Sequence, residues 1–175
     1  MDRRQKKSRK AIFQAFAALL QTRRYEQITV QDIIDSADIS RSTFYAHFET
    51  KDMLLKALCS DIFDHIFAGD LCEYHDHGPQ LQARLAHILY HLQQQKQQVL
   101  GILSCEGSGL FMDYFKERLA ALFSLYLEEF SQDVPRDFLL NHLVGSFAEA
   151  VRWWACMAMT DTPEKVAEAY MAMLP

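Results

Sequence analysis

Residues 29–51 read TVQDIIDSADISRSTFYAHFETK, and this stretch predicts two short helices joined by a tight turn. Thr29 is a good N-cap, and Asp32 three residues later forms with it a pair like a capping box, so a helix should begin at Val30. The apolar spacing is interrupted after this helix, and Ser40 can cap a second one. The stretch therefore has the pattern of a helix-turn-helix.

The second helix, from Arg41 to about His47, is predicted to have one apolar and one polar side. Phe44 and Phe48 should point inward, toward the first helix. The other side carries the polar residues Arg41, Ser42, Thr43, Tyr45 and His47. A first turn that presents Arg, Ser and Thr offers donors for base edges in a major groove and hydroxyls for phosphates. The pattern favours DNA recognition, and the alternative is an ordinary pair of packed helices in an all-α protein.

The charge distribution supports a nucleic-acid surface. Residues 1–51 contain ten Lys and Arg against six Asp and Glu, a net charge of +4, whereas the other 124 residues contain eight against seventeen, a net charge of −9. Such asymmetry indicates a basic binding surface joined to an acidic body. Residues 1–10 hold six of the basic side chains, which either contact phosphates and the minor groove or form a solvated tail.

The same region resembles the DNA-binding signature of the TetR family of bacterial transcription regulators, over roughly residues 8–60. The matching positions are Thr29, Ile33, Ala37, Ile39, Ser40, Thr43, Phe44, Tyr45, His47, Phe48 and Lys51. Asp38 departs from the pattern, because the family often has Gly in this turn, but Asp tolerates the left-handed conformation. Residues that match Tyr45 and Lys51 typically touch the DNA backbone in the family. The alternatives are a half-buried aromatic ring and an ordinary surface lysine.

The helix pattern and the resemblance together predict a set of DNA-binding residues: Thr29, Ser40, Arg41, Ser42, Thr43, Tyr45, His47 and Lys51. The resemblance implies a transcription regulator, most often a repressor. Such a protein binds a near-palindromic operator in double-stranded DNA as a homodimer and is released by a small, largely apolar effector. The alternative is a regulator or adaptor of the same fold, whose packed C-terminal domain responds to a protein partner.

Apolar periodicity along the rest of the chain predicts an all-α fold of about nine helices, with a three-helix DNA-binding headpiece and a C-terminal helical bundle. The expected helices cover residues 8–22, 30–37, 41–47, 51–68, 80–96, 97–104, 109–131, 135–159 and 163–173, with a loop at 69–79. We expect a DNA-binding domain over residues 1–50 and an effector-binding and dimerisation domain over residues 51–175.

Aromatic residues and methionines are abundant in the predicted bundle, and they have two interpretations. One is a dense core, and the other is a cavity for an apolar or aromatic effector. Periodicity cannot separate a filled core from a hollow one. The residues expected to line such a pocket are Tyr90, Leu103, Phe111, Tyr114, Phe115, Phe147, Val151 and Trp154.

The last two predicted helices have apolar or small residues on more than one side, which indicates burial on more than one side. For a terminal helix pair this implies a second copy of the chain, and the resemblance implies the same four-helix dimer interface. The residues expected there are Leu139, Leu143, Ser146, Ala150, Trp153, Val166, Tyr170 and Met173. The alternative is a monomer in which the last helix covers its neighbour alone.

Composition sets the outer limits of function. No apolar run approaches the roughly 18 residues of a membrane span, and the N-terminus lacks the apolar segment of a signal peptide, so we expect a cytoplasmic protein without membrane contact. No nucleophile with a base, Gly-rich phosphate loop or pair of carboxylates in an apolar setting is present, so we expect neither an enzyme nor a cofactor. Four widely spaced cysteines suit reduced thiols better than disulfides.

Several histidines lie near the predicted loop. Cys72, His75 and His77 are close in sequence, and His87 and His91 are four residues apart on the next predicted helix. Imidazoles with that spacing share a helix face and can share a metal ion. No further ligand spacing defines a geometry, so we expect surface histidines and no metal site.

Overall fold

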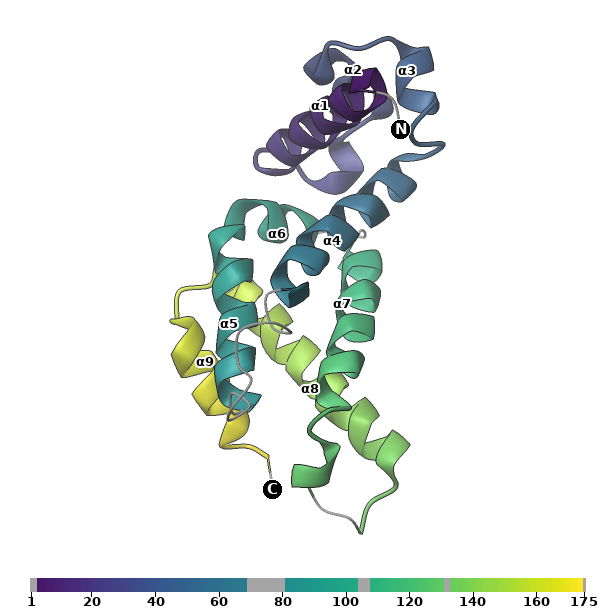
Figure 1. The fold of residues 1–175 in the computed structure, drawn as a ribbon. Coiled ribbons are helices and arrows are strands. Elements are labelled where there is room, and N and C mark those ends of the chain that lie inside the picture. The colour runs from purple at the N-terminus through teal and green to yellow at the C-terminus, as the bar shows by residue number, and fades with distance from the viewer. Residues whose placement is uncertain (1–2, 69–80, 104–107, 131–132, 175) are drawn as a thin grey trace. The chain divides into compact units, whose positions relative to one another are not determined.

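The structure is a computed structural model that describes residues 3–68, 81–103, 108–130 and 133–174. Over these residues the fold is helical and contains no strand, which confirms the predicted all-α class (Figure 1). The α-helices are α1 (Arg3–Leu20), α2 (Val30–Ala37), α3 (Arg41–Tyr45), α4 (Lys51–Ala68), α5 (Leu81–Gln94), α6 (Lys96–Leu103), α7 (Ser108–Phe123), α8 (Arg136–Cys156) and α9 (Pro163–Met171). Two short 3₁₀ helices, η1 (Tyr25–Gln27) and η3 (Leu127–Glu129), complete the described elements.

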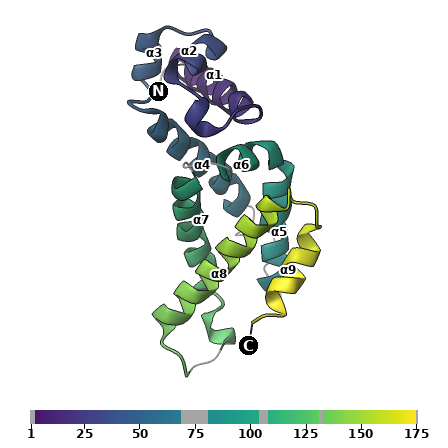
Figure 2. The same cartoon turned by 180° about the vertical axis from the view of Figure 1, so that it is seen from behind.

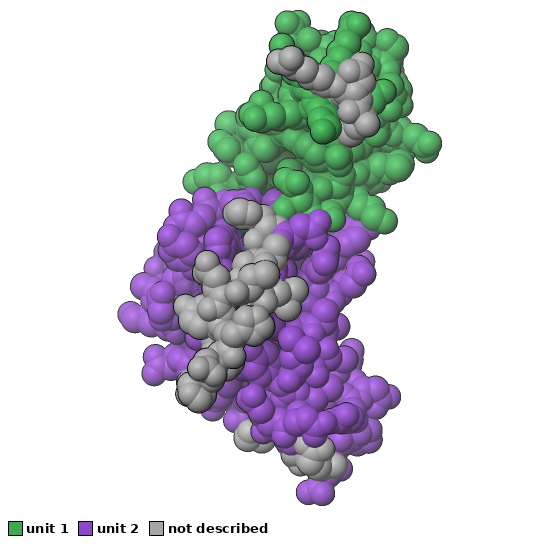
Figure 3. All heavy atoms as spheres, in the orientation of Figure 1, with its two compact units in different colours: residues 1–61, 97–111 green, residues 62–96, 112–175 purple. Residues whose placement is uncertain are grey.

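The chain forms two compact units (Figure 3). The first contains residues 1–61 and 97–111, and the second contains residues 62–96 and 112–175. Helix α4 contributes its first half to one unit and its second half to the other. The domain boundary that we expect at residue 50 stays a prediction.

The first unit holds the helix-turn-helix over an apolar base. Helix α1 packs against α2, and α2 packs against α3. Ile12 and Phe16 of α1, Ile33 of α2 and Phe44 of α3 have no exposed surface. Burying side chains of this size is the main contribution that holds the three short helices together, because none of them is long enough to be stable alone.

Helix α6 approaches the end of α1 so closely that only glycine fits at the contact. A β-carbon at Gly101 would lie 2.0 Å from the carbonyl oxygen of Leu20 and 3.0 Å from its carbonyl carbon. Both residues belong to the first unit. Because the neighbouring atoms are backbone atoms, they cannot turn aside, and any larger residue must displace one of the two helices.

We therefore expect Gly101→Ala to destabilise the protein. The better helix propensity of alanine contributes about 1 kcal/mol, but overpacking against a fixed backbone costs up to about 3 kcal/mol. The net loss of about 2 kcal/mol should lower the melting temperature by roughly 6 °C. Gly109→Ala is the control, since a β-carbon there meets nothing within 4 Å. Equal melting temperatures for the two variants would contradict the close contact.

The second unit is built around an aromatic core. Helix α9 lies alongside α5 and also contacts α8, as Figures 1 and 2 both show. The Phe147 ring of α8 has no exposed surface and lies 4.9 Å from the Tyr170 ring of α9, 6.1 Å from Phe123 and 6.4 Å from Phe115. The Tyr170 hydroxyl donates to the carbonyl of Leu143 at 2.9 Å, so its polar atom is paired inside the core. Burial raises the pKa of this hydroxyl.

Helix α7 ends earlier than predicted. We expected one helix over residues 109–131, but α7 stops at Phe123 and η3 follows after a turn. The amides of Leu125 and Tyr126 donate to carbonyls three residues back, so the last turn tightens and leaves the α-helical path. Tyr126 is thereby buried with its ring beneath the Arg84 guanidinium, 5.9 Å away. No glycine or proline marks this end in the sequence.

Helix α8 also ends before the predicted residue 159, at Cys156. Ala158 and Met159 both have positive φ angles, 52° and 48°, which no α-helix accommodates. The turn is held by the Trp154 indole, which donates to the carbonyl of Asp161 at 3.0 Å, and by the Gln93 amide, which donates to the carbonyl of Met159 at 3.2 Å. Side-chain donors from two helices thus stabilise a strained connection.

Some predictions concern surroundings and not helices. The loop expected at 69–79 lies outside the described residues. Among the described helices, none combines the length and hydropathy that a bilayer crossing requires. Cys59 is a buried free thiol whose pKa burial raises to about 12, and Cys156 is an exposed free thiol. Cys72 and Cys105 lie outside the described residues.

Candidate nucleic-acid interface

The first helix of the motif begins where the sequence predicts. The Thr29 hydroxyl accepts the Asp32 amide at 3.1 Å, and the Asp32 carboxylate accepts the Thr29 amide at 2.8 Å, which confirms a capping box at Val30. These bonds from the Thr29 hydroxyl and backbone lower the pKa of Asp32, and Arg23, 3.2 Å away, lowers it further. The hydroxyl and the amide of Thr29 are thus both engaged within the chain.

The turn between the helices has the left-handed conformation that the sequence analysis allowed for Asp38. This residue has φ 50° and ψ 54°, and its amide donates to the carbonyls of Asp35 and Ile34. An aspartate in place of the family's usual glycine therefore supports the same turn. Its exposed carboxylate adds a negative charge beside the motif, which is mildly unfavourable close to phosphates.

Helix α3 begins with three linked hydroxyls. Ser40 caps it by accepting the Thr43 amide at 3.2 Å. The Ser40 hydroxyl also lies 2.9 Å from the Ser42 hydroxyl and 2.8 Å from the Thr43 hydroxyl. The hydroxyls that we predicted as separate DNA contacts are therefore connected through one oxygen, an arrangement that fixes their rotamers before any ligand is present.

The outward side of α3 is polar and the inward side is apolar. Arg41, Ser42 and Tyr45 are exposed, whereas Thr43 is half-buried. The Arg41 guanidinium lies 5.7 Å from the centre of the Tyr45 ring. Beneath them, Phe44 is fully buried, with its ring edge-on to Tyr45 at 5.5 Å. The helix is shorter than predicted and ends at Tyr45, so His47 belongs to the connection that follows.

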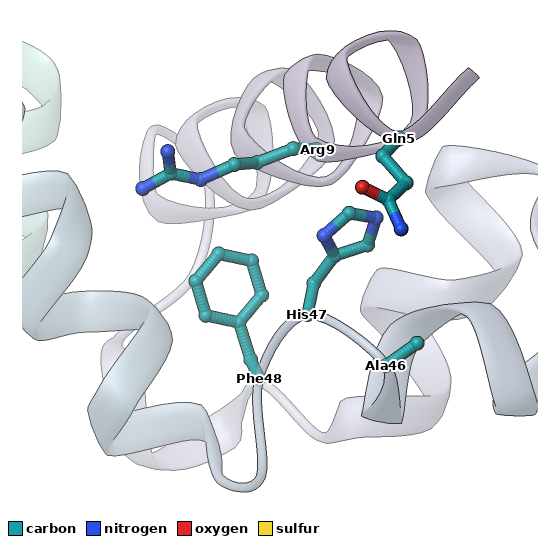
Figure 4. Close-up of a pocket in the computed structure, with 5 residues that line it drawn as sticks. All are labelled: Gln5, Arg9, Ala46, His47 and Phe48. Atoms are coloured by element: carbon teal, nitrogen blue, oxygen red, sulfur yellow. The ribbon is translucent and has the colours of Figure 1, made fainter. Parts of the chain in front are cut away.

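His47 faces helix α1 across a surface cleft of about 320 Å³ (Figure 4). The cleft is lined by Gln5, Arg9, Ala46, His47 and Phe48. The His47 Nε2 atom lies 2.7 Å from the Ser8 hydroxyl of α1. The Arg9 guanidinium lies over the rings of Phe13 and Phe48, at 5.1 and 6.0 Å. The sequence analysis missed Ser8, because no local spacing links it to a residue 39 positions away.

Lys51 is half-buried and has partners inside the chain. Its ammonium donates to the carbonyls of Tyr25 and Ile28, both at 2.8 Å, and lies 4.0 Å from the centre of the Tyr25 ring. The sequence analysis placed Tyr25 in a polar connection, but its side chain is buried and forms part of η1. The only local hint was an aromatic residue three positions before Ile28.

The structure distributes the predicted effector-pocket residues over both units. Leu103 and Phe111 belong to the first unit and the other six to the second. Phe111, Phe115, Phe147, Val151 and Trp154 have no exposed surface. Leu103 and Tyr114 are half-buried, and Tyr90 is exposed on α5. Tyr90 therefore faces solvent, and an effector pocket stays a prediction.

The predicted dimer residues also separate into two groups. Leu139, Leu143, Val166 and Tyr170 are buried within the chain's own core. Trp153 and Met173 are exposed, and Ser146 and Ala150 are half-buried. Only the second group is available for a partner without unfolding part of the chain. The expected interface is correspondingly reduced to these residues and their exposed neighbours.

In the described part of the chain, no three His, Cys, Asp or Glu side chains come together as a metal site requires. The rings of His87 and His91, one turn apart on α5, have centres 4.4 Å apart. Cys72, His75 and His77 lie outside the described residues.

Comparison with known families covers both parts of the chain. Residues 12–58 match the description "Bacterial regulatory proteins, tetR family", and residues 80–175 match "Transcriptional regulator C-terminal region". The crystal structure of a TetR transcriptional regulator from Streptococcus agalactiae 2603V superposes with a TM-score of 0.78. It is 36% identical in sequence, and the match covers 98% of this chain and 96% of that one.

Two curated proteins are similar over shorter segments. An uncharacterised HTH-type transcriptional regulator of Bacillus subtilis, YxbF, is 37% identical over 71 residues, which are 38% of this chain and 19% of YxbF. The DhaS activator of the dhaKLM operon in Lactococcus lactis is 43% identical over 61 residues, which are 35% of this chain and 30% of DhaS. These matches span less than a third of either relative. The family matches over both parts and the full-length similarity establish that this chain belongs to the TetR family of bacterial transcription regulators.

Proposed function

We propose that the protein is a cytoplasmic transcription regulator that binds a near-palindromic operator as a homodimer through helix α3. The observation that carries this proposal is the built motif: a five-residue helix, capped by Ser40, that presents Arg41, Ser42 and Tyr45 outward over the buried Phe44. A short helix seated in this way enters a major groove with its first turn. In this proposal, residues 1–50 bind DNA, and residues 51–175 bind the partner and the effector.

Exposed apolar residues on α8 support the dimer. Phe138, Trp153 and Met157 are exposed, and Phe138 and Trp153 share one side of the helix. Gly145 lies on that side, and a β-carbon there would meet nothing within 4 Å, which leaves room for a second helix to approach. Met173, just after α9, is exposed as well. Two recognition helices related by a two-fold axis would meet successive major grooves, about 34–36 Å apart.

The proposed effector is small and largely apolar, because the second unit offers mainly aromatic and aliphatic surface. The ring contacts of Phe115, Phe123, Phe147 and Tyr170 favour the alternative equally, namely a filled core in a regulator that responds to a protein partner. Differential scanning fluorimetry of the purified protein against a library of apolar acids and aromatic compounds separates them. An effector should raise the melting temperature and lower operator affinity.

We propose repression as the direction of control. An operator that overlaps a promoter blocks polymerase when it is occupied, and effector binding releases it by linkage. The L. lactis relative DhaS is described as an activator, so the opposite sign is a defined alternative. A reporter gene placed behind the selected operator should be expressed more strongly when the regulator's gene is deleted. Weaker expression would establish activation.

The roles of the α3 side chains are tested with fragments selected from genomic DNA. We expect Tyr45→Ala to weaken binding to operator and random DNA by a similar factor, because backbone contacts carry no sequence information. Ser42→Ala and Thr43→Ala should instead change the preference among operator variants by about 1 kcal/mol, or roughly fivefold. Fluorescence anisotropy on both kinds of DNA, at fixed salt, gives the ratio.

Tyr45→Phe is the matched control, since it removes only the hydroxyl and keeps the ring beside Arg41. Melting temperatures of all four variants show whether the cap at Ser40 is intact. An equal loss on operator and random DNA for Thr43→Ala would contradict its role in base recognition. Absence of binding by the unmodified protein to any fragment, even at low salt, would contradict the proposed function itself.

A further inference from the structure

We propose that Lys51 is a positioning residue, which forms with Asp52 and Tyr25 a clasp between the first turn of α4 and the connection from α1 to α2. This inference rests on the proposed function, because the clasp is argued to orient the DNA-binding helix α3. It differs from the family-based expectation, in which Lys51 touches the DNA backbone. The three residues all belong to the first unit.

The clasp engages Tyr25 at three places. The Lys51 ammonium donates to the Tyr25 carbonyl at 2.8 Å and lies 4.0 Å from the centre of its ring. The Tyr25 hydroxyl donates to the carboxylate of Asp52. Consecutive residues of α4 thus bind the two ends of one buried residue, whose ring also packs edge-on against Phe16 of α1 at 6.2 Å.

The same ammonium reaches a second carbonyl, that of Ile28, also at 2.8 Å. Ile28 immediately precedes Thr29, the N-cap of α2. An ammonium has three donors, so two of them are committed to backbone oxygens in the half-buried site. To reach a phosphate, Lys51 would leave both carbonyls and the ring face, and the carbonyls would lose charge-assisted hydrogen bonds.

The position of the clasp along the chain explains how it acts on α3. Helix α3 ends at Tyr45 and α4 begins at Lys51, so only five residues join them. Thr50 caps α4 by accepting the Met53 amide at 3.1 Å, and Phe48 within the connection is buried. Once the first turn of α4 is held against η1, this short connection leaves α3 few orientations. Fewer orientations mean a larger fraction of binding-competent molecules.

Lys51→Met in the full-length protein tests the proposal, because methionine keeps much of the apolar stem and removes the charge. We expect a melting temperature about 4 °C lower and operator affinity about tenfold weaker, as the competent fraction falls. The slope of log affinity against log salt should be unchanged, since no phosphate contact is lost. A phosphate contact predicts the reverse, with a slope smaller by about 0.9 for each contact.

Two further sets of variants keep the test decisive. Lys10→Met, at an exposed position on α1, removes the same charge outside the clasp and should leave the melting temperature unchanged. Tyr25→Phe and Asp52→Asn each loosen the hydroxyl end without changing Lys51. Their destabilising effects on melting should be smaller than that of Lys51→Met. They should also be less than additive in the double variant, because both disrupt the same hydrogen bond.

An unchanged melting temperature for Lys51→Met, or a salt slope reduced by about 0.9 per contact, overturns the proposal. If Lys51→Met does not fold, Tyr25→Phe decides, and its melting at the temperature of the unmodified protein overturns the clasp. The melting measurements need no DNA. A protein that binds no operator would therefore contradict the proposed function while leaving the clasp confirmed or rejected on its own.

Discussion

Trp153→Glu is expected to yield a folded monomer that binds its operator at least about 100-fold more weakly than the unmodified protein. The Trp153 side chain is 54% exposed on α8. It shares a side of that helix with Phe138 and with the open position at Gly145. A large aromatic residue at the centre of an interface often contributes 2 kcal/mol or more to association. A buried glutamate in its place would also lack a partner charge.

The loss on DNA follows from the loss of the partner. In a dimer the second headpiece binds at a high effective concentration, so a monomer forfeits most of the affinity without any change in its own contacts. Sedimentation velocity gives the oligomeric state, circular dichroism the fold, and anisotropy the operator affinity. Leu125→Glu is the control, because Leu125 is 65% exposed but lies in the turn after α7. A Trp153→Glu protein that remains dimeric would exclude this face as the interface.

Phe147→Ala should lower the free energy of unfolding by about 3–5 kcal/mol, the cost of a large cavity in a filled core. The Phe147 ring has no exposed surface and contacts the rings of Phe115, Phe123 and Tyr170. With total stabilities of roughly 5–15 kcal/mol, this is a substantial fraction, and the melting temperature should fall by about 10 °C. Chemical denaturation followed by circular dichroism measures the change.

Phe138→Ala on the same helix is the matched control, since its ring is 66% exposed and its loss should cost less than about 0.5 kcal/mol. The size of the Phe147 effect also bears on the effector. A full loss supports a filled second unit, and with it a regulator that responds to a protein partner. A loss below about 1 kcal/mol would indicate that the ring already borders a void, as an effector cavity requires.

Local features of the fold were predictable to the residue. The capping box of Thr29 and Asp32, the cap at Ser40 and the cap of α9 at Thr162 join residues three apart in sequence, so spacing alone identifies them. The end of α7 was not predictable, because it depends on the burial of Tyr126 beneath Arg84, which lies on another helix. Apolar periodicity continues past Phe123 and gives no sign of the turn.

Periodicity also identified apolar surfaces without saying what covers them. Leu143, Tyr170 and Trp153 all belong to the stripes that the sequence assigned to a partner chain. In the structure the first two are buried by their own chain, and only Trp153 remains exposed. A stripe records that a face is buried somewhere, whereas the helix that buries it is chosen by the packing of segments far apart in sequence.

By itself, the sequence determined the helical class, the helix-turn-helix and the family resemblance, because these depend on interactions among residues a few positions apart. Only the tertiary structure decided which side chains of the motif remain available for DNA. The ammonium of Lys51 is held by carbonyls 26 and 23 positions earlier, and His47 meets a serine 39 positions earlier. Hydrogen bonds over such separations form only where folding brings the segments together, and no local pattern records them.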